Sequence, residues 1–384
     1  MEPIPVTIVT GFLGSGKTTL LNRLLKDPAL KDTAVIVNEF GEVGLDHLLM
    51  EQSGDGIIEL SDGCLCCTVR SDLMMTLAGL LEKVQTGAIK ALSRIVIETT
   101  GLADPVPVML SVMGHPALQY MLRLDGIVTT VDAVNGMATL DNHPEAVRQA
   151  AVAERILLTK TDLAGRARVA GLVERLERLN PSAPILDSQQ VPSAAALVSA
   201  GAFDPATKSA DVRQWLAAED HRHHHADGSC DDPEHCHHPD HHHAGAHHHG
   251  HDHHHDVTRH DARIRSFSIV HDKPVDKLAV AMFMDLIASA HGEKLLRMKG
   301  IVELADDPQR PLVIHAVQQV IHPPQRLEQW PQGPRGTRIV LIVQDLGEDF
   351  VRRMFAAFTG TPSPDTPDAQ ALIDNPLAVP GMRR

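Results

Sequence analysis

A phosphate-binding loop near the start of the chain constrains the fold more than any other feature of the sequence. The run GFLGSGKTT (residues 11–19) directly follows the apolar segment Val6–Thr10 and directly precedes the helical pattern Leu20–Leu25. Its glycines let consecutive backbone N–H groups face an anion, and the following helix adds its positive N-terminal end. Lys17 can reach the β- and γ-phosphates, and the hydroxyl of Thr18 can bind Mg²⁺. The sequence therefore predicts a nucleoside triphosphate site with the contact residues Gly14, Ser15, Gly16, Lys17, Thr18 and Thr19.

Charge and hydropathy argue against two classes of partner. The formal net charge of −14 disfavours general affinity for nucleic acid, which needs a basic face. No apolar run approaches the roughly 18 residues of a membrane span, and Met1–Pro5 lacks the basic and apolar regions of a signal peptide. We therefore expect a cytoplasmic protein that has neither nucleic acid nor a membrane as a partner.

Apolar runs alternate with helix-period stretches such as Ser71–Val84 and Arg166–Leu179 as far as about Leu186. This alternation predicts an α/β domain: a mostly parallel sheet with helices on both faces, and ligands at the carboxyl ends of its strands. The expected strands are Val6–Thr10, Ala34–Asn38, Gly56–Leu60, Arg94–Glu98, Gly126–Val131, Arg155–Thr159 and Pro184–Asp187.

The composition divides the rest of the chain. Histidine dominates residues 221–260, with Asp, Gly, Pro, Cys230 and Cys236, so this segment cannot form a core and is expected to be disordered. We predict a nucleotide domain over 1–200, a linker over 201–262, a small C-terminal α+β domain over 263–360 and a flexible tail over 361–384. The expected order of the third part is strand (Arg263–Val270), helix (Val275–Ala290), strands (Leu295–Leu304, Leu312–Ile321, Thr337–Asp345) and helix (Glu348–Phe358).

The segment Arg155–Asp162 is a predicted strand that ends in the loop TKTD. Asp162 can accept hydrogen bonds from the ring N–H and the exocyclic amine of guanine, a pair of donors that adenine lacks. The stem of Lys160 can cover the face of the base, and Ser188 in the next loop can add a backbone contact. We therefore expect a guanine nucleotide, GTP or GDP, at Thr159, Lys160, Asp162 and Ser188.

A second buried strand, Arg94–Glu98, leads into Thr99-Thr100-Gly101. Glu98 can hold a Mg²⁺-bound water, and the N–H of Gly101 can sense the γ-phosphate. A capping role for Glu98 is the structural alternative. Because phosphoryl transfer needs mostly positioning and charge neutralisation, the expected catalytic residues are Lys17, Glu98 and Gly101 rather than a nucleophile.

Cys64, Cys66 and Cys67 lie within four residues, in GCLCC after the third predicted strand. In a reducing compartment such a cluster is a compact thiolate site for Zn²⁺, Co²⁺ or Cu⁺. Buried, inert cysteine is the alternative. The segment NEFGEVGLD (residues 38–46), after the second strand, adds carboxylates nearby, of which Glu39 is the expected metal-site residue, whereas Glu42, Asp46 and the adjacent His47 stay undecided.

These motifs resemble the CobW-type P-loop GTPases, metallochaperones of the class that includes the hydrogenase and urease nickel-insertion GTPases. The elements that carry the resemblance are TGFLGSGKTTLLN (10–22), NEFGEVGLD (38–46), GCLCC (63–67), ETTGLADP (98–105), VDA (131–133) and TKTD (159–162), with LRMKG (296–300) and 338–346 for the second domain. Thr159, where many GTPases carry Asn, lacks one amide contact to the base.

The resemblance implies a GTP-gated metal carrier. GTP would organise the segments of Glu39 and Cys64–Cys67 into a tight site, and hydrolysis would release the metal, zinc first and cobalt second, to a client metalloprotein. A second copy of the chain is a further candidate partner. Two alternatives remain open: a metal store with incidental nucleotide binding, and a P-loop phosphotransferase. The histidine-rich run would concentrate metal through many neutral imidazoles, or serve only as a solvated linker.

Overall fold

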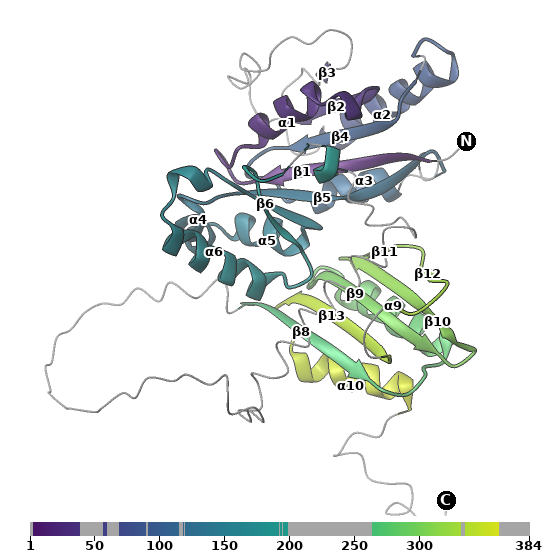
Figure 1. Ribbon diagram of the computed structural model, residues 1–384. Helices are drawn as coiled ribbons and strands as arrows, with labels where there is room; N and C mark the ends of the chain where they lie inside the picture. The colour runs from purple at the N-terminus through teal and green to yellow at the C-terminus, as the bar shows by residue number, and fades with distance from the viewer. Residues whose placement is uncertain are drawn as a thin grey trace, which may run out of the picture.

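The computed structural model describes residues 3–38, 57–59, 69–89, 91–114, 118, 120–191, 193, 195–198, 263–331 and 335–360. No helix among them has both the length and the hydropathy needed to cross a membrane. The histidine-rich run, the cysteine cluster and the tail lie outside the described residues. The described elements form two sheets with their helices, one in each half of the molecule (Figure 1).

The N-terminal sheet has seven strands in the order β3-β2-β4-β1-β5-β6-β7, and every pairing in it is parallel. Each strand lies within a few residues of a predicted one. The strands are β1 (Ile4–Gly11), β2 (Thr33–Asn38), β3 (Ile57–Glu59), β4 (Arg94–Thr99), β5 (Leu122–Asp132), β6 (Arg155–Thr159) and β7 (Ile185–Asp187). The predicted parallel α/β fold is confirmed.

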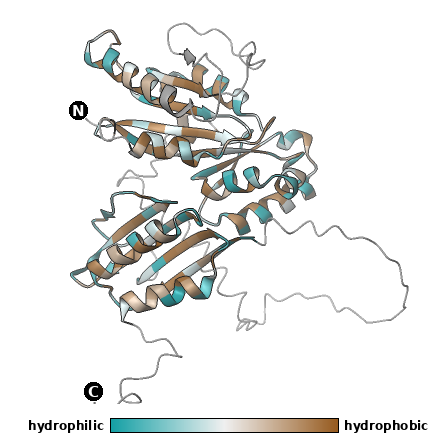
Figure 2. Cartoon of the chain, turned by 180° about the vertical axis from the view of Figure 1, so that it is seen from behind, coloured by the Kyte–Doolittle hydropathy of each residue, from teal (hydrophilic) through white to brown (hydrophobic). Residues whose placement is uncertain are grey.

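Helices cover both faces of this sheet, and Figure 2 shows the apolar strands between them. Alternate side chains of β4 belong to different cores: Ile95 and Ile97 pack against the helices on one face of the sheet, whereas Val96 packs against the helices on the other face. Burial on both faces explains the near-continuous apolar strands. The helices and 3₁₀ turns are α1 (Lys17–Lys26), η1 (Pro28–Leu30), α2 (Val69–Gln85), α3 (Val106–Gly114), α4 (Gly136–Asn142), α5 (Pro144–Val152), η3 (Thr161–Leu163), α6 (Arg166–Leu179) and α7 (Ala195–Val198).

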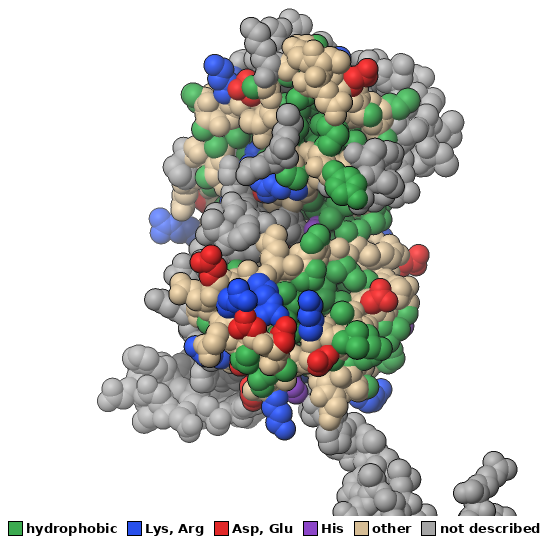
Figure 3. Space-filling view, turned by 90° about the vertical axis from the view of Figure 1, so that its right-hand side faces the viewer, with side chains coloured by type: hydrophobic (Ala, Val, Ile, Leu, Met, Phe, Trp, Pro, Cys, Tyr) green, Lys and Arg blue, Asp and Glu red, His purple; other side chains and the backbone are tan. Residues whose placement is uncertain are grey.

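The C-terminal sheet is antiparallel, in the order β11-β10-β9-β13-β8, with β12 paired to β10. Helices α9 and α10 cover one face through an apolar core that includes Phe283 and Phe355. Figure 3 shows acidic and basic side chains side by side on one surface of this half. The elements are β8 (Ile264–His271), α9 (Lys277–His291), β9 (Leu295–Leu304), β10 (Asp307–Val317), β11 (Val320–Ile321), β12 (Gln325–Arg326), β13 (Thr337–Gln344) and α10 (Glu348–Thr359).

One predicted strand is wrong. The single strand expected over Leu312–Ile321 is two strands, because the chain reverses between Val317 and Val320, which pair with each other. Gln318 takes the left-handed conformation that this turn requires, with φ of 50°. The side-chain pattern does not reveal the reversal, since no Gly, Asn or Pro marks it.

The second face of the C-terminal sheet meets the N-terminal domain. Leu296 of β9 and Ile342 of β13 belong to the same apolar core as α5 and α6. Within this apolar contact lies a buried ionic cluster, in which Arg297 and Lys299 of β9 both pair with Glu154 at the start of β6. Arg297 also donates to the carbonyl of Val152 at 2.7 Å. The two domains are therefore joined by packing and by charge.

Candidate nucleotide-binding site

The predicted phosphate-binding loop connects β1 to α1. Gly16 is the N-cap of α1 and has φ of 95°, a left-handed conformation in which a side chain would be strained. Gly14 is exposed, Ser15 is buried, Thr18 is half-buried and Thr19 is exposed. The loop therefore presents backbone and the first turn of α1 at the carboxyl edge of the sheet, where an anion is stabilised by free N–H groups.

Neighbouring strands hold the loop from behind. The hydroxyls of Ser15 and Thr130 lie 2.6 Å apart, and the hydroxyl of Thr159 donates to the carbonyl of Ser15 at 2.7 Å. Lys17 is 9% exposed, and its ammonium donates to the carbonyls of Gly11 at 3.1 Å and Phe12 at 3.4 Å. Thr159, expected at the base, therefore supports the phosphate loop through its hydroxyl.

Glu98 lies near the end of β4, next to the phosphate-binding loop. It pairs in register with Val9 of β1 and Val37 of β2, and its side chain is buried. The hydroxyl of the following Thr99 donates to that of Thr10 at 2.7 Å, which fixes the end of β4 against β1. The structure thus brings Glu98 to the same sheet edge as Lys17 and Thr18.

Gly101 follows β4 and packs directly on the phosphate-binding loop. A Cβ atom at Gly101 would lie 2.6 Å from the backbone nitrogen and 2.8 Å from the Cα of Leu13. Only glycine allows this approach. The predicted γ-phosphate sensor therefore packs closely on both the backbone and the side chain of Leu13 in the phosphate-binding loop.

Replacing Gly101 with alanine is expected to push this loop away from Leu13. We predict a loss of about 1–3 kcal/mol in the free energy of unfolding, together with weaker binding of a non-hydrolysable GTP analogue. Urea unfolding and a fluorescent-nucleotide titration measure the two effects. Gly79→Ala is the matched control, since no atom lies within 4 Å of its added methyl group in the interior of α2. Equal behaviour of the two variants would contradict the close packing.

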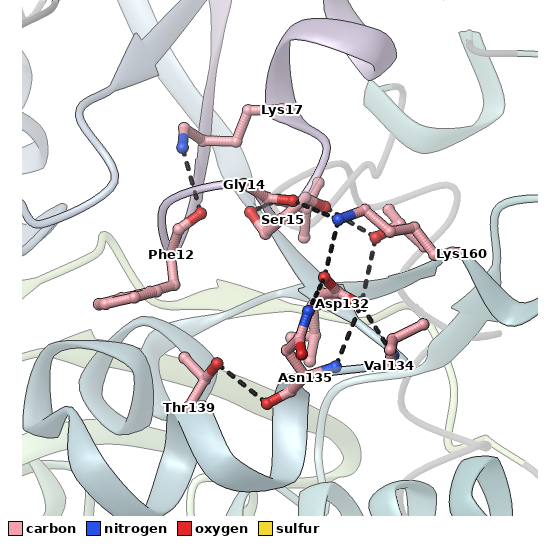
Figure 4. Close-up of polar contacts among 12 residues, drawn as sticks. Phe12, Gly14, Ser15, Lys17, Asp132, Val134, Asn135, Thr139 and Lys160 are labelled. Carbon is pink, nitrogen blue, oxygen red and sulfur yellow. Dashed lines mark hydrogen bonds and ion pairs between the residues drawn. The ribbon is translucent and has the colours of Figure 1, made fainter. Parts of the chain in front are cut away.

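Lys160 reaches from the predicted base loop to the phosphate loop (Figure 4). Its backbone is left-handed, with φ of 56°, and its ammonium donates to the carbonyl of Gly14 at 2.8 Å and to Asp132 at 2.7 Å. Asp132, at the end of β5, also accepts from the backbone N–H groups of Val134 at 2.7 Å and Asn135 at 3.2 Å. The two predicted halves of the nucleotide site are thus linked directly.

Asp132 belongs to this candidate site by its contacts, and the sequence analysis quoted it only as part of VDA. Burial by itself would raise the pKa of its carboxyl, but the hydrogen bonds from Lys160, Asn135 and Val134 outweigh burial and hold the pKa below its usual range. The carboxylate is therefore ionised at neutral pH and holds the Lys160 ammonium in place. The signal available in the sequence was an aspartate at the carboxyl end of a buried strand.

Asp162 and Ser188 lie on adjacent loops. Asp162 is exposed in η3, and the Gln189 side chain donates to it at 3.4 Å. The hydroxyl of Thr161 donates to Asp187 at 2.8 Å, which ties the two loops together. The N–H of Ser188 donates to the Leu158 carbonyl at 2.9 Å, and its carbonyl accepts from the Arg23 guanidinium at 2.7 Å, so both backbone polar groups of this residue already have protein partners.

A cavity of about 280 Å³ opens beside these residues. Its walls come from the phosphate loop, the end of β5, α4 and α5, and they include Phe12, Ser15, Asp132 and Lys160. The ring of Phe12 stacks on His143 at 4.3 Å between centroids. Of the predicted nucleotide contacts, Gly14, Ser15 and Lys160 line this cavity, whereas Lys17, Thr18 and Asp162 do not, so it lies beside the phosphate loop on the side of α4 and α5.

The metal-site residues Glu39, Cys64, Cys66 and Cys67 lie outside the described residues, as do Glu42, Asp46 and His47. Among the residues that the structure describes, no group of three or more His, Cys, Asp or Glu side chains is arranged to hold a metal. The predicted metal site therefore stays a prediction from sequence.

Sequence profiles and known proteins identify the family. The profile of the CobW/HypB/UreG nucleotide-binding domain matches residues 5–187, and that of the cobalamin synthesis protein CobW C-terminal domain matches residues 264–359. The zinc chaperone YjiA of Escherichia coli is 32% identical over 93% of this chain and 99% of its own length. The zinc chaperone CobW of a Sinorhizobium species is 29% identical over 92% of this chain and 97% of its own.

A solved structure agrees with the sequence matches. The Zn(II)-bound YjiA GTPase from E. coli superposes with a TM-score of 0.64 at 29% identity, covering 93% of this chain and 99% of that one. A Zn(II)-bound triple mutant of the same GTPase, with one glutamate and two cysteines replaced by alanine, matches equally well. The chain described here belongs to the CobW family of P-loop GTPases, with the family's nucleotide-binding domain followed by its C-terminal domain.

Proposed function

We propose that this protein is a GTP-hydrolysing metallochaperone that carries zinc to a client metalloprotein, with cobalt as the second candidate cargo. Relatives named zinc chaperones align with it over almost their whole length, and this supports the class of function. The domain boundaries that we predicted, 1–200 and 263–360, are part of the proposal.

The backbone of the phosphate loop and the charges of Lys17 and Asp162 support a guanine nucleotide as the ligand of this site. The loop cradle, the buried Lys17 and the exposed Asp162 suit a triphosphate at one end and a base at the other. Thr18 and Glu98 would hold Mg²⁺, Thr18 directly and Glu98 through a bound water. The bound ion would supply charge neutralisation between the β- and γ-phosphates.

Hydrolysis in this site rests on positioning. Lys17 neutralises charge on the transferring phosphoryl group, and the N–H of Gly101 donates to it, while water attacks and GDP leaves. Lys160 covers the base, and Asp132 keeps Lys160 tied to Gly14. Asp162 accepts from the guanine edge, which favours GTP over ATP.

One observation carries the gating part of the proposal: the order β3-β2-β4-β1 within a parallel sheet. Asn38, the last residue of β2, pairs with Thr99 of β4, the residue after Glu98, and Glu39 follows Asn38 along the chain. Glu59, the last residue of β3, pairs with Val37 and precedes the cysteine cluster along the chain. The predicted metal segments thus leave the sheet at its nucleotide edge, where GTP can bias them.

The proposal is tested by titrating Zn²⁺, Co²⁺ and Ni²⁺ against a chromophoric competitor, with GDP, a GTP analogue or no nucleotide. We expect zinc to bind at least tenfold more tightly with the GTP analogue than with GDP, which corresponds to about 1.4 kcal/mol of coupling. A triple variant with Cys64, Cys66 and Cys67 replaced by serine should lose this difference.

The titration is run on the full chain and on a variant lacking residues 221–260, because histidines there bind metal by themselves. Equal zinc affinity in all three nucleotide states, in both proteins, contradicts gating and leaves a metal store as the function. If the serine variant keeps the difference in zinc affinity between nucleotide states, the cysteine site is contradicted but the nucleotide dependence is not.

A further inference from the structure

The loop after β4 lies between the phosphate-binding loop and α5. On one side, the backbone of Gly101 packs against Leu13. On the other side, the side-chain amide of Gln149 donates to the carbonyls of Gly101 at 3.1 Å and Ala103 at 2.9 Å. Gly101 and Gln149 therefore hold this loop from its two sides.

Gln149 is built into the domain core. It is 1% exposed, and its own carbonyl accepts from the hydroxyl of Thr129 at 2.8 Å, so β5 fixes α5 at this residue. Burying an amide is unfavourable unless it is hydrogen-bonded. Its Oε1 has no hydrogen-bond partner among the described residues. The opposite orientation of the amide would place this oxygen against two carbonyls, so both N–H donors must face the loop.

The two hydrogen bonds determine where the loop directs its own donors. The described peptides are all trans, so a carbonyl and the next N–H point in opposite directions. Gln149 holds the Gly101 carbonyl towards α5, and the N–H of Leu102 therefore points away from α5. The Thr100 carbonyl accepts from the N–H of Ala103 at 3.1 Å, which fixes the preceding peptide and with it the direction of the Gly101 N–H. Within the described part of the chain, neither Gly101 nor Leu102 donates its N–H to a protein acceptor.

We infer that Gln149 is a positioning residue for GTP hydrolysis. It makes no contact with the nucleotide, but holds the Gly101 loop so that the loop's backbone donors meet the γ-phosphate, where charge develops during hydrolysis. The inference rests on the proposed GTP hydrolysis and is independent of zinc transport. Because GDP has no γ-phosphate, the role of Gln149 belongs to GTP alone.

The test compares Gln149→Leu with Gln149→Asn in the full chain. Leucine fills a similar volume without donors, and asparagine is one methylene too short to reach both carbonyls. We expect kcat for GTP to fall by about 10–100-fold in the leucine variant and by less in the asparagine variant. GDP affinity should stay within twofold of the wild type, while affinity for a GTP analogue falls.

Gln85→Leu on α2 is the matched control, since the same substitution at an exposed position should leave kcat unchanged. A purely structural role would lower GDP affinity and thermal stability as much as affinity for the analogue, and that result overturns the inference. A kcat within twofold of the wild type in both Gln149 variants also overturns it. If the leucine variant does not fold, the asparagine variant decides by the same readouts.

Failure of the proposed function gives a different pattern. A wild-type protein that does not hydrolyse GTP fails that proposal, whereas the difference between GDP and analogue affinity still tests Gln149. Wild-type hydrolysis that is insensitive to Gln149 rejects only the positioning role.

Discussion

Replacing Lys17 with alanine is expected to lower kcat for GTP hydrolysis by about 10²–10³-fold. The ammonium lies over the loop, held by the carbonyls of Gly11 and Phe12, and is 9% exposed. A preorganised charge of this kind stabilises the transferring phosphoryl group without reorganisation during the reaction. Phosphate release at saturating GTP measures the effect.

Lys83→Ala, on the exposed face of α2, is the control and should hydrolyse GTP like the wild type. GDP titration and circular dichroism establish that the Lys17 variant is folded. A folded Lys17→Ala protein with more than one third of the wild-type kcat would show that this loop does not carry the reaction.

The second large effect is expected at the domain junction. Glu154→Gln should destabilise the protein by about 3–5 kcal/mol, because it leaves two buried cations without their counter-charge. The side chains of Arg297 and Lys299 are 2% and 8% exposed, and both pair with Glu154, the lysine at 2.7 Å. Urea unfolding followed by circular dichroism gives the free energy.

Glu174→Gln provides the matched control. Glu174 pairs with Arg178 across one turn of α6, and both side chains are 71% exposed. Such exposed pairs contribute about 0.3–0.5 kcal/mol. If both glutamine variants lost the same small amount, the junction would not depend on this charge.

The same carboxylate gives the junction a pH dependence. Burial alone would raise the pKa of Glu154, but Arg297, Lys299 and His315 lower it, and the net pKa lies well below the ordinary value of 4.5. A depressed pKa stabilises the folded state fully above 4.5, and this stabilisation is lost as the pH falls towards the folded pKa. Below pH 4.5 the advantage of the wild type over Glu154→Gln should shrink by about 1.4 kcal/mol per pH unit. A constant difference from pH 7 to 3 would contradict this.

The sequence predicted the N-terminal sheet well, for a physical reason. Strands such as Arg94–Thr99 are buried on both faces, so they read as unbroken apolar runs between polar loops. The predicted Lys17 loop and the base loop come to the same edge, because parallel strands end together. The turn at Gln318 was missed, since its left-handed backbone is carried by a residue without turn preference.

Local sequence alone determined the class of this protein: a glycine-rich loop between strand and helix dictates an anion cradle, and three closely spaced cysteines indicate a soft-metal site, which the described residues leave untested. Only the tertiary structure decided which distant residues support that cradle. Gln149 is 48 residues from Gly101, and Arg297 is 145 from Val152. Contacts over such separations depend on how helices and sheets pack, so the residues adjacent to a side chain in the sequence do not predict them.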